Sequence, residues 1–329
     1  MSFANTSITD IIATTIQNRT RKIADNVTNN NALLKKLSMK GKQKPFSGGN
    51  VIMQELSFQE NSNAGYYSGY DILPVGVSDV ISAAEFQIKQ AAVPVIISGL
   101  EQLQNTGKEQ MIDLMEGRLS VAESTMSNLI STGLYSDGTG SSGKEIGGLQ
   151  YLVQDDPTSA GDVGGIPQQT WAFWRNATQN TAVGFANLLA DMNTLWASLV
   201  RGGDRPDLVI GDSAFWTAYV GLLQAQQRFT GTDSGEFGFP TVKFMDADVC
   251  LDGGIYFPSR ASGGAGSGSG AYFLNCDYLH YRPHSQRNMV PLSPNRRYAV
   301  NQDAEVQILA WAGNLTTSGR RMQGRLTVS

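Results

Sequence analysis

The feature that most constrains this fold is a long stretch of helical periodicity in the first half of the chain. Between residues 100 and 130, apolar side chains recur at spacings of three and four. Ser98 and Glu101 make a capping-box pattern before it, and Gly133 predicts a left-handed cap after it. We therefore expect a helix from Gly99 to Ile130, a rod of about 48 Å at about 1.5 Å per residue.

Charge is distributed unevenly over the segments that precede this helix. Residues 1–44 carry eight cations and two acids, whereas residues 45–88 carry five acids and no Lys or Arg. Neighbouring segments of opposite sign are expected when each meets a different partner surface. Chance clustering on solvated faces is the alternative interpretation.

Neither of these two segments is expected to fold alone. Residues 1–45 are interpreted as an arm, in which the isoleucines between residues 8 and 16 predict a short amphipathic helix. Residues 46–80 predict an extended β-hairpin, with strands at Val51–Phe58 and Tyr66–Ile72. A lone two-stranded hairpin is marginal in water, so this one needs another surface to lie on.

The second half of the chain predicts a mixed α/β unit followed by β-rich sequence. After a flexible Ser/Gly stretch at 136–143, a helix is expected from Val183 to Arg201, with Gly202 as its stop. A buried strand follows at Leu208–Ile210, and Asp212 or Ser213 caps a third helix through residue 227. Further strands are predicted at 242–244, 255–257, 272–281 and 305–315, with a flexible glycine-rich loop at 263–270.

No motif for catalysis or metal binding is complete. The segment 138–144 matches half of a phosphate-binding loop, but Glu145 stands where a Ser or Thr must bind Mg²⁺. His280 and His284 have a spacing that grips metal on a helix, but they flank Pro283 in an extended segment, which favours structural roles. We expect no catalytic, cofactor or metal site. A carboxylate pair within residues 181–289 is the enzyme alternative, because such pairs leave no sequence signature.

The remaining composition narrows the setting of the protein. Cys250 and Cys276 form no CxxC pair, so neither a disulfide framework nor a zinc site is expected. No signal peptide and no membrane span are expected, which favours a cytosol-like compartment. Only 16% of the residues are charged, which mildly favours a surface hidden in contacts over an ordinary neutral surface.

The order of these segments and two short motifs resemble the major capsid proteins of tailed bacteriophages, a fold shared with encapsulins. One motif is Gly164-Gly165-Ile166 followed by Phe173-Trp174-Arg175-Asn176, and the other is Pro206–Ile210 leading into an aromatic-rich helix. Pro167-Gln168 departs from the family pattern, in which an Asp-Arg pair is expected. That departure puts in question any salt bridge the family makes there.

The resemblance implies an α+β tailed-phage major capsid fold. Its parts would be an N-terminal arm (1–45), an extended loop across a neighbouring subunit (46–80), a peripheral domain with a spine helix (81–180), an α/β axial domain (181–289) and a return to the peripheral domain (290–329). Some family members weld the shell through a lysine in the extended loop. Since this loop has no lysine, a non-covalent shell is expected.

The implied function is structural. Copies of the chain would assemble in the host bacterial cytoplasm into hexamers and pentamers of an icosahedral head that encloses double-stranded DNA. Scaffolding, portal and decoration proteins are further expected partners, and no membrane is. An encapsulin-like compartment is the nearest alternative, and a nucleic-acid-binding protein acting through residues 1–44 is another.

Two sets of contact residues are predicted. Anionic contacts to a neighbouring subunit are assigned to Glu55, Glu60 and Asp71. Contacts of the arm with DNA, without sequence specificity, or with an acidic partner are assigned to Arg19, Arg21, Lys22, Lys35, Lys36 and Lys40.

Overall fold

The computed structural model describes residues 31–73, 75–98, 108–181, 185–225, 241–252, 257–258, 267–292, 297–298 and 304–328. The helices are α2 (Ala32–Met39), α4 (Lys108–Gly133), α5 (Gly140–Gly143), α6 (Leu149–Leu152), α7 (Leu188–Leu199) and α8 (Ser213–Ala225), with 3-10 turns η2 (Ala172–Trp174) and η3 (Arg320–Met322). The strands are β1 (Val51–Ser57), β2 (Ile81–Gln87), β3 (Lys89–Ser98), β4 (Asp162–Val163), β5 (Ile166–Pro167), β6 (Ala177–Thr181), β7 (Leu208–Gly211), β8 (Thr241–Phe244), β9 (Ala247–Leu251), β10 (Phe257–Pro258), β11 (Ser267–Leu274), β12 (Leu279–Pro283), β13 (Val290–Pro291), β14 (Arg297–Tyr298), β15 (Ala304–Thr317) and β16 (Gly324–Val328).

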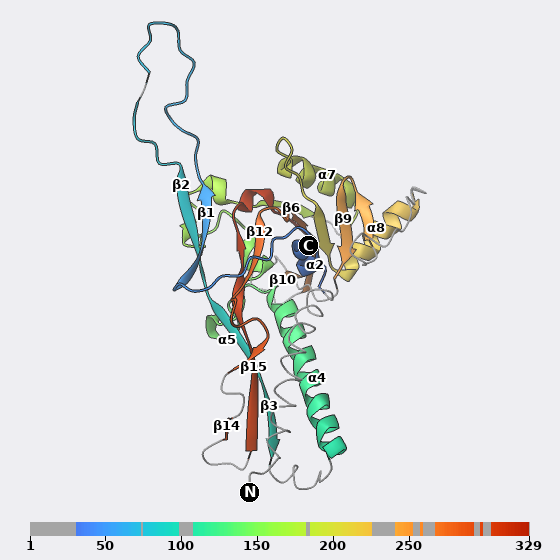
Figure 1. Ribbon diagram of the computed structural model, residues 1–329. Helices are drawn as coiled ribbons and strands as arrows, with labels where there is room; N and C mark the ends of the chain where they lie inside the picture. Colours follow the sequence, from blue (N-terminus) through green and yellow to red (C-terminus); the bar gives the residue numbers. More distant parts are fainter. Residues whose placement is uncertain are drawn as a thin grey trace.

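Two larger sheets organise the body of the protein (Figure 1). The first has the strand order β6-β16-β11-β7-β9-β8, with β10 also paired to β11. The second is built on the long strand β15, which pairs with β12, β13, β14 and β3. Strands β3 and β15 run out together toward one end of the molecule, and α4 packs along β3 there.

The first sheet separates two hydrophobic cores, because successive side chains of a strand point to opposite faces. Val209 of β7 packs with α7 and α8, beside Leu195 and Phe215. Leu208 and Ile210 of the same strand face the other core, which contains α2, the end of α4 and α6. Each helix layer is therefore held by the apolar face it presents to this sheet.

The predicted helices and the buried strand around this sheet are present, but two predicted bounds are wrong. Residues 185–187 of the predicted helix Val183–Arg201 form a turn before α7, and the predicted strand 272–281 is divided between β11, which ends at Leu274, and β12, which begins at Leu279 in the other sheet. α7 buries its predicted apolar face, and Gly202 beyond its end has a φ of 64°. β7 is the predicted buried strand, with all four of its residues buried. Asp212 caps α8, since its carboxylate accepts a 2.9 Å hydrogen bond from the Phe215 N–H. Residues 226–227 of the predicted third helix lie outside the described part.

The long helix is present as α4, with two differences from the prediction. Ser98 is the last residue of β3, a strand that was not predicted, and residues 99–107 lie outside the described part, so the start of the helix at Gly99 stays a prediction. α4 ends at Gly133, but the predicted left-handed cap is wrong because Gly133 has no positive φ. Close packing is the reason for glycine there, since a Cβ would lie 3.0 Å from the Cδ1 of Ile146.

Residues 31–46 are part of the folded body. Asn31 caps α2 by accepting a 3.1 Å hydrogen bond from the Leu34 N–H. Leu33, Leu34 and Leu37 are buried in the core that α2 shares with β12. Residues 1–30, which include the predicted amphipathic helix between residues 8 and 16, lie outside the described residues.

The predicted hairpin exists, but its return strand was wrongly placed. β1 pairs with β2 in antiparallel register, from Val51 opposite Gln87 to Ser57 opposite Ile81. The stretch Tyr66–Ile72 forms no strand and lies in the loop 58–80, which projects far from the body in Figure 1. The predicted flexible loop at 263–270 is also partly wrong, since residues 267–270 begin β11 and the others lie outside the described part.

Candidate assembly surfaces

The projecting loop 58–80 exposes apolar side chains. Ile72, Val75 and Val77 are 95%, 97% and 96% exposed, and Tyr66 and Tyr70 are fully exposed. Loops this long without secondary structure are uncommon in compact domains and are usually functional. Contiguous exposed apolar surface marks interaction sites. The loop therefore offers a contact surface that the described part of the chain leaves uncovered.

The three predicted anionic contacts lie on this hairpin and are exposed. Glu55 is on an outward position of β1, and Glu60 lies in the loop. The Asp71 carboxylate accepts a 2.8 Å hydrogen bond from the Ser68 N–H and so stabilises a turn in the loop. The structure leaves these side chains accessible to a second protein, and their contact with a neighbouring subunit stays a prediction.

An aromatic cluster holds the start of the loop against the body. The ring of Phe58 lies 5.7 Å from that of Trp171 and 6.2 Å from that of Phe173, measured between centroids. Trp174 is buried next to them, and its indole N–H donates a 2.9 Å hydrogen bond to the Val163 carbonyl. Two members of the Phe173–Asn176 motif thus help to position the base of the hairpin.

The glycine motif holds the other strand of the hairpin. The Glu85 N–H of β2 donates a 2.9 Å hydrogen bond to the Gly164 carbonyl. Gly164 and Gly165 have φ angles of 62° and 73°, in the region that favours glycine. A Cβ on Gly164 would lie 3.0 Å from the Cβ of Ala84, so that side chains of β2 leave no room for one. The motif therefore fixes where β2 leaves the body.

A fully buried arginine connects the Phe173–Asn176 motif, and Gln168 shortly after the glycine motif, with the end of the chain. Arg320 of η3 donates hydrogen bonds to the Leu152 carbonyl at 2.7 Å, to Gln168 Oε1 at 3.1 Å and to Asn176 Oδ1 at 3.0 Å. These three acceptors are uncharged, and burial lowers the pKa of Arg320 to about 10. Gln168, the departure from the family pattern, thus serves as a neutral acceptor for a buried cation.

Two of the predicted arm cations contact acidic residues of the same chain. Lys36 lies 2.8 Å from Asp248, and Lys40 lies 2.9 Å from Asp207 and 3.0 Å from Asp277. Burial opposes the charge on Lys40, but hydrogen bonds and attraction from these carboxylates outweigh it and raise the pKa of Lys40. The same pairs attach α2 to the sheet beneath it.

The other arm residues divide into two groups. Lys35 lies partly exposed on α2, whereas Arg19, Arg21 and Lys22 lie outside the described residues. Contact of any of these six cations with DNA therefore stays a prediction.

The half phosphate-binding loop at 138–144 and the histidine pair His280 and His284 do not have the geometry of a chemical site in the described part of the chain. Residues 138–144 follow helix α4 and contain only the short turn α5, so the strand that a phosphate-binding loop requires is missing there. His280 is in the extended strand β12, where burial and nearby cations lower the pKa of its side chain to about 4. Within the described part of the chain, no cluster of His, Cys, Asp and Glu has the form of a metal site, and no helix is long and apolar enough to cross a membrane.

Sequence reasoning missed Arg320 and the apolar character of the loop 58–80. Arg320 carries no local signal, because its acceptors lie more than 140 residues earlier in the chain. The loop did carry a signal, since the apolar Val75 and Val77 follow the predicted strand Tyr66–Ile72 without belonging to any predicted strand.

Solved structures of capsids and of an encapsulin share the fold of this chain. No family model matches the chain, and no curated protein matches it. Among solved structures, the capsid of cyanophage A-1(L) is 14% identical with a TM-score of 0.60, covering 89% of this chain and 92% of that chain. The capsid of a native GTA particle is 11% identical with a TM-score of 0.60, covering 89% and 90%. The SrpI encapsulin of Synechococcus elongatus PCC 7942 is 9% identical with a TM-score of 0.53, covering 86% and 83%.

At these identities the likeness concerns the fold. It extends over most of each chain and includes a phage capsid, a GTA capsid and an encapsulin, and phage capsids and encapsulins are the two groups that the sequence resembles. The predicted α+β capsid architecture is confirmed, and this chain has the fold of the phage capsid proteins and the encapsulin to which it is similar.

Proposed function

We propose that this chain is the major capsid protein of a tailed bacteriophage. Its copies assemble into hexamers and pentamers of an icosahedral head that encloses double-stranded DNA, and the protein acts as a structural subunit and not as an enzyme. The observation that carries this proposal is the projecting hairpin, anchored at its base by Gly164 and Phe173 of the first family-like motif and exposing an apolar loop on a capsid fold.

The physical argument concerns the loop between the two strands of the hairpin. The strands pair with each other and bury Ile52, Leu56 and Phe86 in the core of the body, but the loop 58–80 exposes aliphatic and aromatic residues to solvent. Exposed apolar surface of this kind marks interaction sites. A neighbouring copy that covers the loop supplies the missing burial, and many such modest contacts add up through multivalency.

The parts of the chain take the roles that the resemblance implies. Residues 46–80 form the extended loop; 81–180 and 290–329 form the peripheral domain around α4; and 181–289 form the axial domain that meets at the centre of each capsomer. The arm, residues 1–45, is fastened at its end by Lys36 and Lys40, so DNA contacts are assigned to its earlier cations. The protein would reside in the virion after assembly in the host cytoplasm, with scaffolding, portal and decoration proteins as partners.

Electron microscopy tests this proposal. The chain is expressed alone or with a candidate scaffold, and closed particles are expected; a monomer that stays monodisperse under both conditions contradicts it. Nuclease-protected DNA in particles from infected cells favours a phage head, whereas protein cargo without DNA favours an encapsulin-like compartment. Because residues 45–88 contain no lysine, boiled particles should give a single subunit band, and ladders of linked subunits contradict a non-covalent shell.

A further inference from the structure

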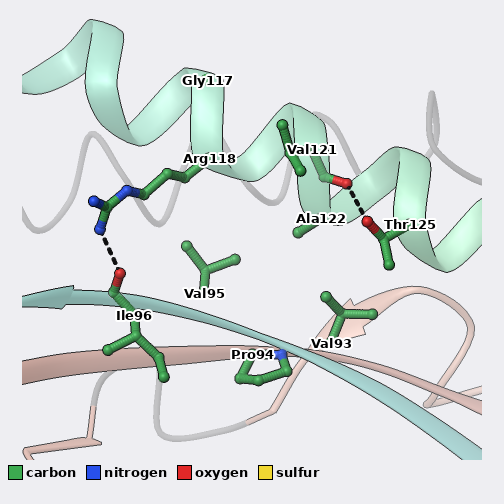
Figure 2. Close-up of a pocket in the computed structure, with 9 residues that line it drawn as sticks. All are labelled: Val93, Pro94, Val95, Ile96, Gly117, Arg118, Val121, Ala122 and Thr125. Carbon is green, nitrogen blue, oxygen red and sulfur yellow. Dashed lines mark hydrogen bonds between the residues drawn. The ribbon is translucent and has the colours of Figure 1, made fainter.

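Strand β3 is an outer strand of the second sheet. It pairs along its ten residues with β15, and no other described strand pairs with it. α4 packs on one face of β3, and Val93 and Val95 point toward this helix (Figure 2). The helix covers that face, so the outer edge of β3, which is the edge turned away from β15, has no partner strand in the described part of the chain.

Every second residue of β3 directs its backbone groups to this outer edge. Pro94 lies opposite Ile308 of β15. The Ile308 carbonyl accepts a 2.9 Å hydrogen bond from the Leu292 N–H, which follows β13 on the other side of β15, so Ile308 bonds away from β3. Hydrogen-bonded and non-hydrogen-bonded pairs alternate along antiparallel strands. Ala92, Pro94 and Ile96 therefore point their backbone groups outward.

The sequence of this edge favours pairing with another strand. Residues 90–98 carry no charge, and Val95, Ile96 and Ile97 are types that favour strands. The side chain of Ile96 is 52% exposed. An exposed strand edge is a template for another chain, and uncharged segments of high strand propensity without proline are the most prone to such pairing. Without a device against it, we expect β3 to pair with the same edge of a second copy.

Two residues block the centre of this edge. Pro94 has no N–H, so it removes a donor that an added strand would need, and prolines within sheets are confined to such outer positions. The Arg118 guanidinium reaches from α4 and donates a 2.6 Å hydrogen bond to the Ile96 carbonyl (Figure 2). It occupies the place beside this oxygen that the N–H of an added strand would take. Two successive outward positions are thus unsuited to a strand ladder.

Strand β8, at one end of the first sheet, has a similar arrangement. Lys243 puts a charged, exposed side chain on this outer strand. The Lys243 carbonyl accepts a 3.2 Å hydrogen bond from the Tyr219 hydroxyl of α8. A side chain from the covering helix thus binds a carbonyl of the outer strand in both sheets, and charges and prolines are common means of protecting such edges.

We propose that Pro94 and Arg118 keep the outer edge of β3 from pairing with the same edge of a second copy. Chains outside a particle are thereby prevented from joining strand to strand, and contacts between copies are left to other surfaces. The proposal goes beyond the shell function and does not depend on it, because it concerns the unassembled chain.

Sedimentation of the unassembled fraction of the full chain tests this proposal. The double variant Pro94→Ala with Arg118→Met adds a donor at position 94 and removes the side chain that binds the Ile96 carbonyl. Ala92→Thr is the matched control, since it raises strand propensity on the same edge and leaves both blocking residues in place. Hydrogen exchange of the residue-92 N–H reports whether the edge is paired. Should the double variant fail to fold, Pro94→Ala alone, which keeps the contacts of Arg118, takes its place.

The expected result is that the double variant forms species larger than those of the unmodified chain, in a share that rises with concentration. In these species the residue-92 N–H should exchange about tenfold or more slowly. Ale sizes and exchange rates of Ala92→Thr should match those of the unmodified chain. A double variant that sediments like the unmodified chain overturns the proposal. Larger species with unchanged exchange at this N–H, or equal oligomerisation of Ala92→Thr, overturn it as well.

Discussion

Replacing Gly164 with alanine should loosen the hairpin at its base. The backbone there has a φ of 62°, which costs an alanine about 1–2 kcal/mol. The new Cβ would also lie 3.0 Å from the Cβ of Ala84 and 3.1 Å from the Cζ of Phe86, and overpacking of this kind costs about 1–3 kcal/mol. The two effects together predict a loss of about 2–5 kcal/mol of unfolding free energy.

Gly165→Ala is the matched control for this substitution. Gly165 has a φ of 73°, but a Cβ there would meet no atom within 4 Å. Its replacement should therefore cost only the backbone contribution of about 1–2 kcal/mol. The difference between the two variants measures the packing of Gly164 under β2.

Urea unfolding of the unassembled subunit gives the global cost, and hydrogen exchange at Glu85 gives the local one. The Glu85 N–H donates to the Gly164 carbonyl, so its protection reports whether the hairpin base is closed. Exchange in Gly164→Ala should be about fivefold or more faster than in Gly165→Ala, since the packing cost is about 1–3 kcal/mol and each step of about 1.4 kcal/mol is a factor of ten. Equal unfolding and equal exchange in both variants would refute the role assigned to Gly164.

Reversing the charge of Glu55, Glu60 and Asp71 together should leave soluble monomers or capsomers and no shells. Sedimentation that still shows shells would refute the assignment of these acids as contacts between subunits. Arg320→Met removes three buried hydrogen bonds, of which only the one to Asn176 Oδ1 leaves an acceptor that still binds the Gln154 N–H, and should cost about 2–4 kcal/mol by urea unfolding, with the exposed Arg321→Met as a near-neutral control. Similar costs for both would contradict the role of Arg320. Lys40→Met should lose about 1 kcal/mol near neutral pH. Because folding raises the pKa of Lys40, its contribution is present below its ordinary value of 10.5 and is lost as the pH rises through the higher folded value, so the gap to the unmodified chain should close in alkali. A gap that stays constant would count against these salt bridges.

The parts of the fold that follow from local pattern were predictable from the sequence. α7 and α8 have regular helical spacing and recognisable caps, and β7 is a short apolar run between turn residues. These elements pack against one sheet, so their periodicity and their burial agree.

The strands that the sequence did not reveal depend on distant partners. β3 contains Pro94 and two alanines, which dilute the strand signal, yet it pairs along its length with β15. β16 is buried at all five positions, so it shows no alternation. The reverse error occurred at Tyr66–Ile72, where aromatic residues favoured a strand but no partner strand lies beside them.

For the candidate assembly surfaces, the features that depend on residue order could be predicted from the sequence, whereas those that depend on tertiary contacts could not. The acidic, cation-free character of the hairpin and the two motifs could be read from residue order alone. Their physical roles could not, because Gly164 matters through its contact with β2 and Gln168 through its contact with Arg320. Both contacts join segments that only the tertiary fold brings together.

A reconstruction of the assembled particle by electron cryomicroscopy tests the central claim most directly. The account predicts an icosahedral shell built from this chain alone or with its scaffold, with the hairpin of each copy lying on a neighbouring copy around five- and six-fold positions. A closed shell in which the loop 58–80 projects into solvent without touching another copy would contradict it.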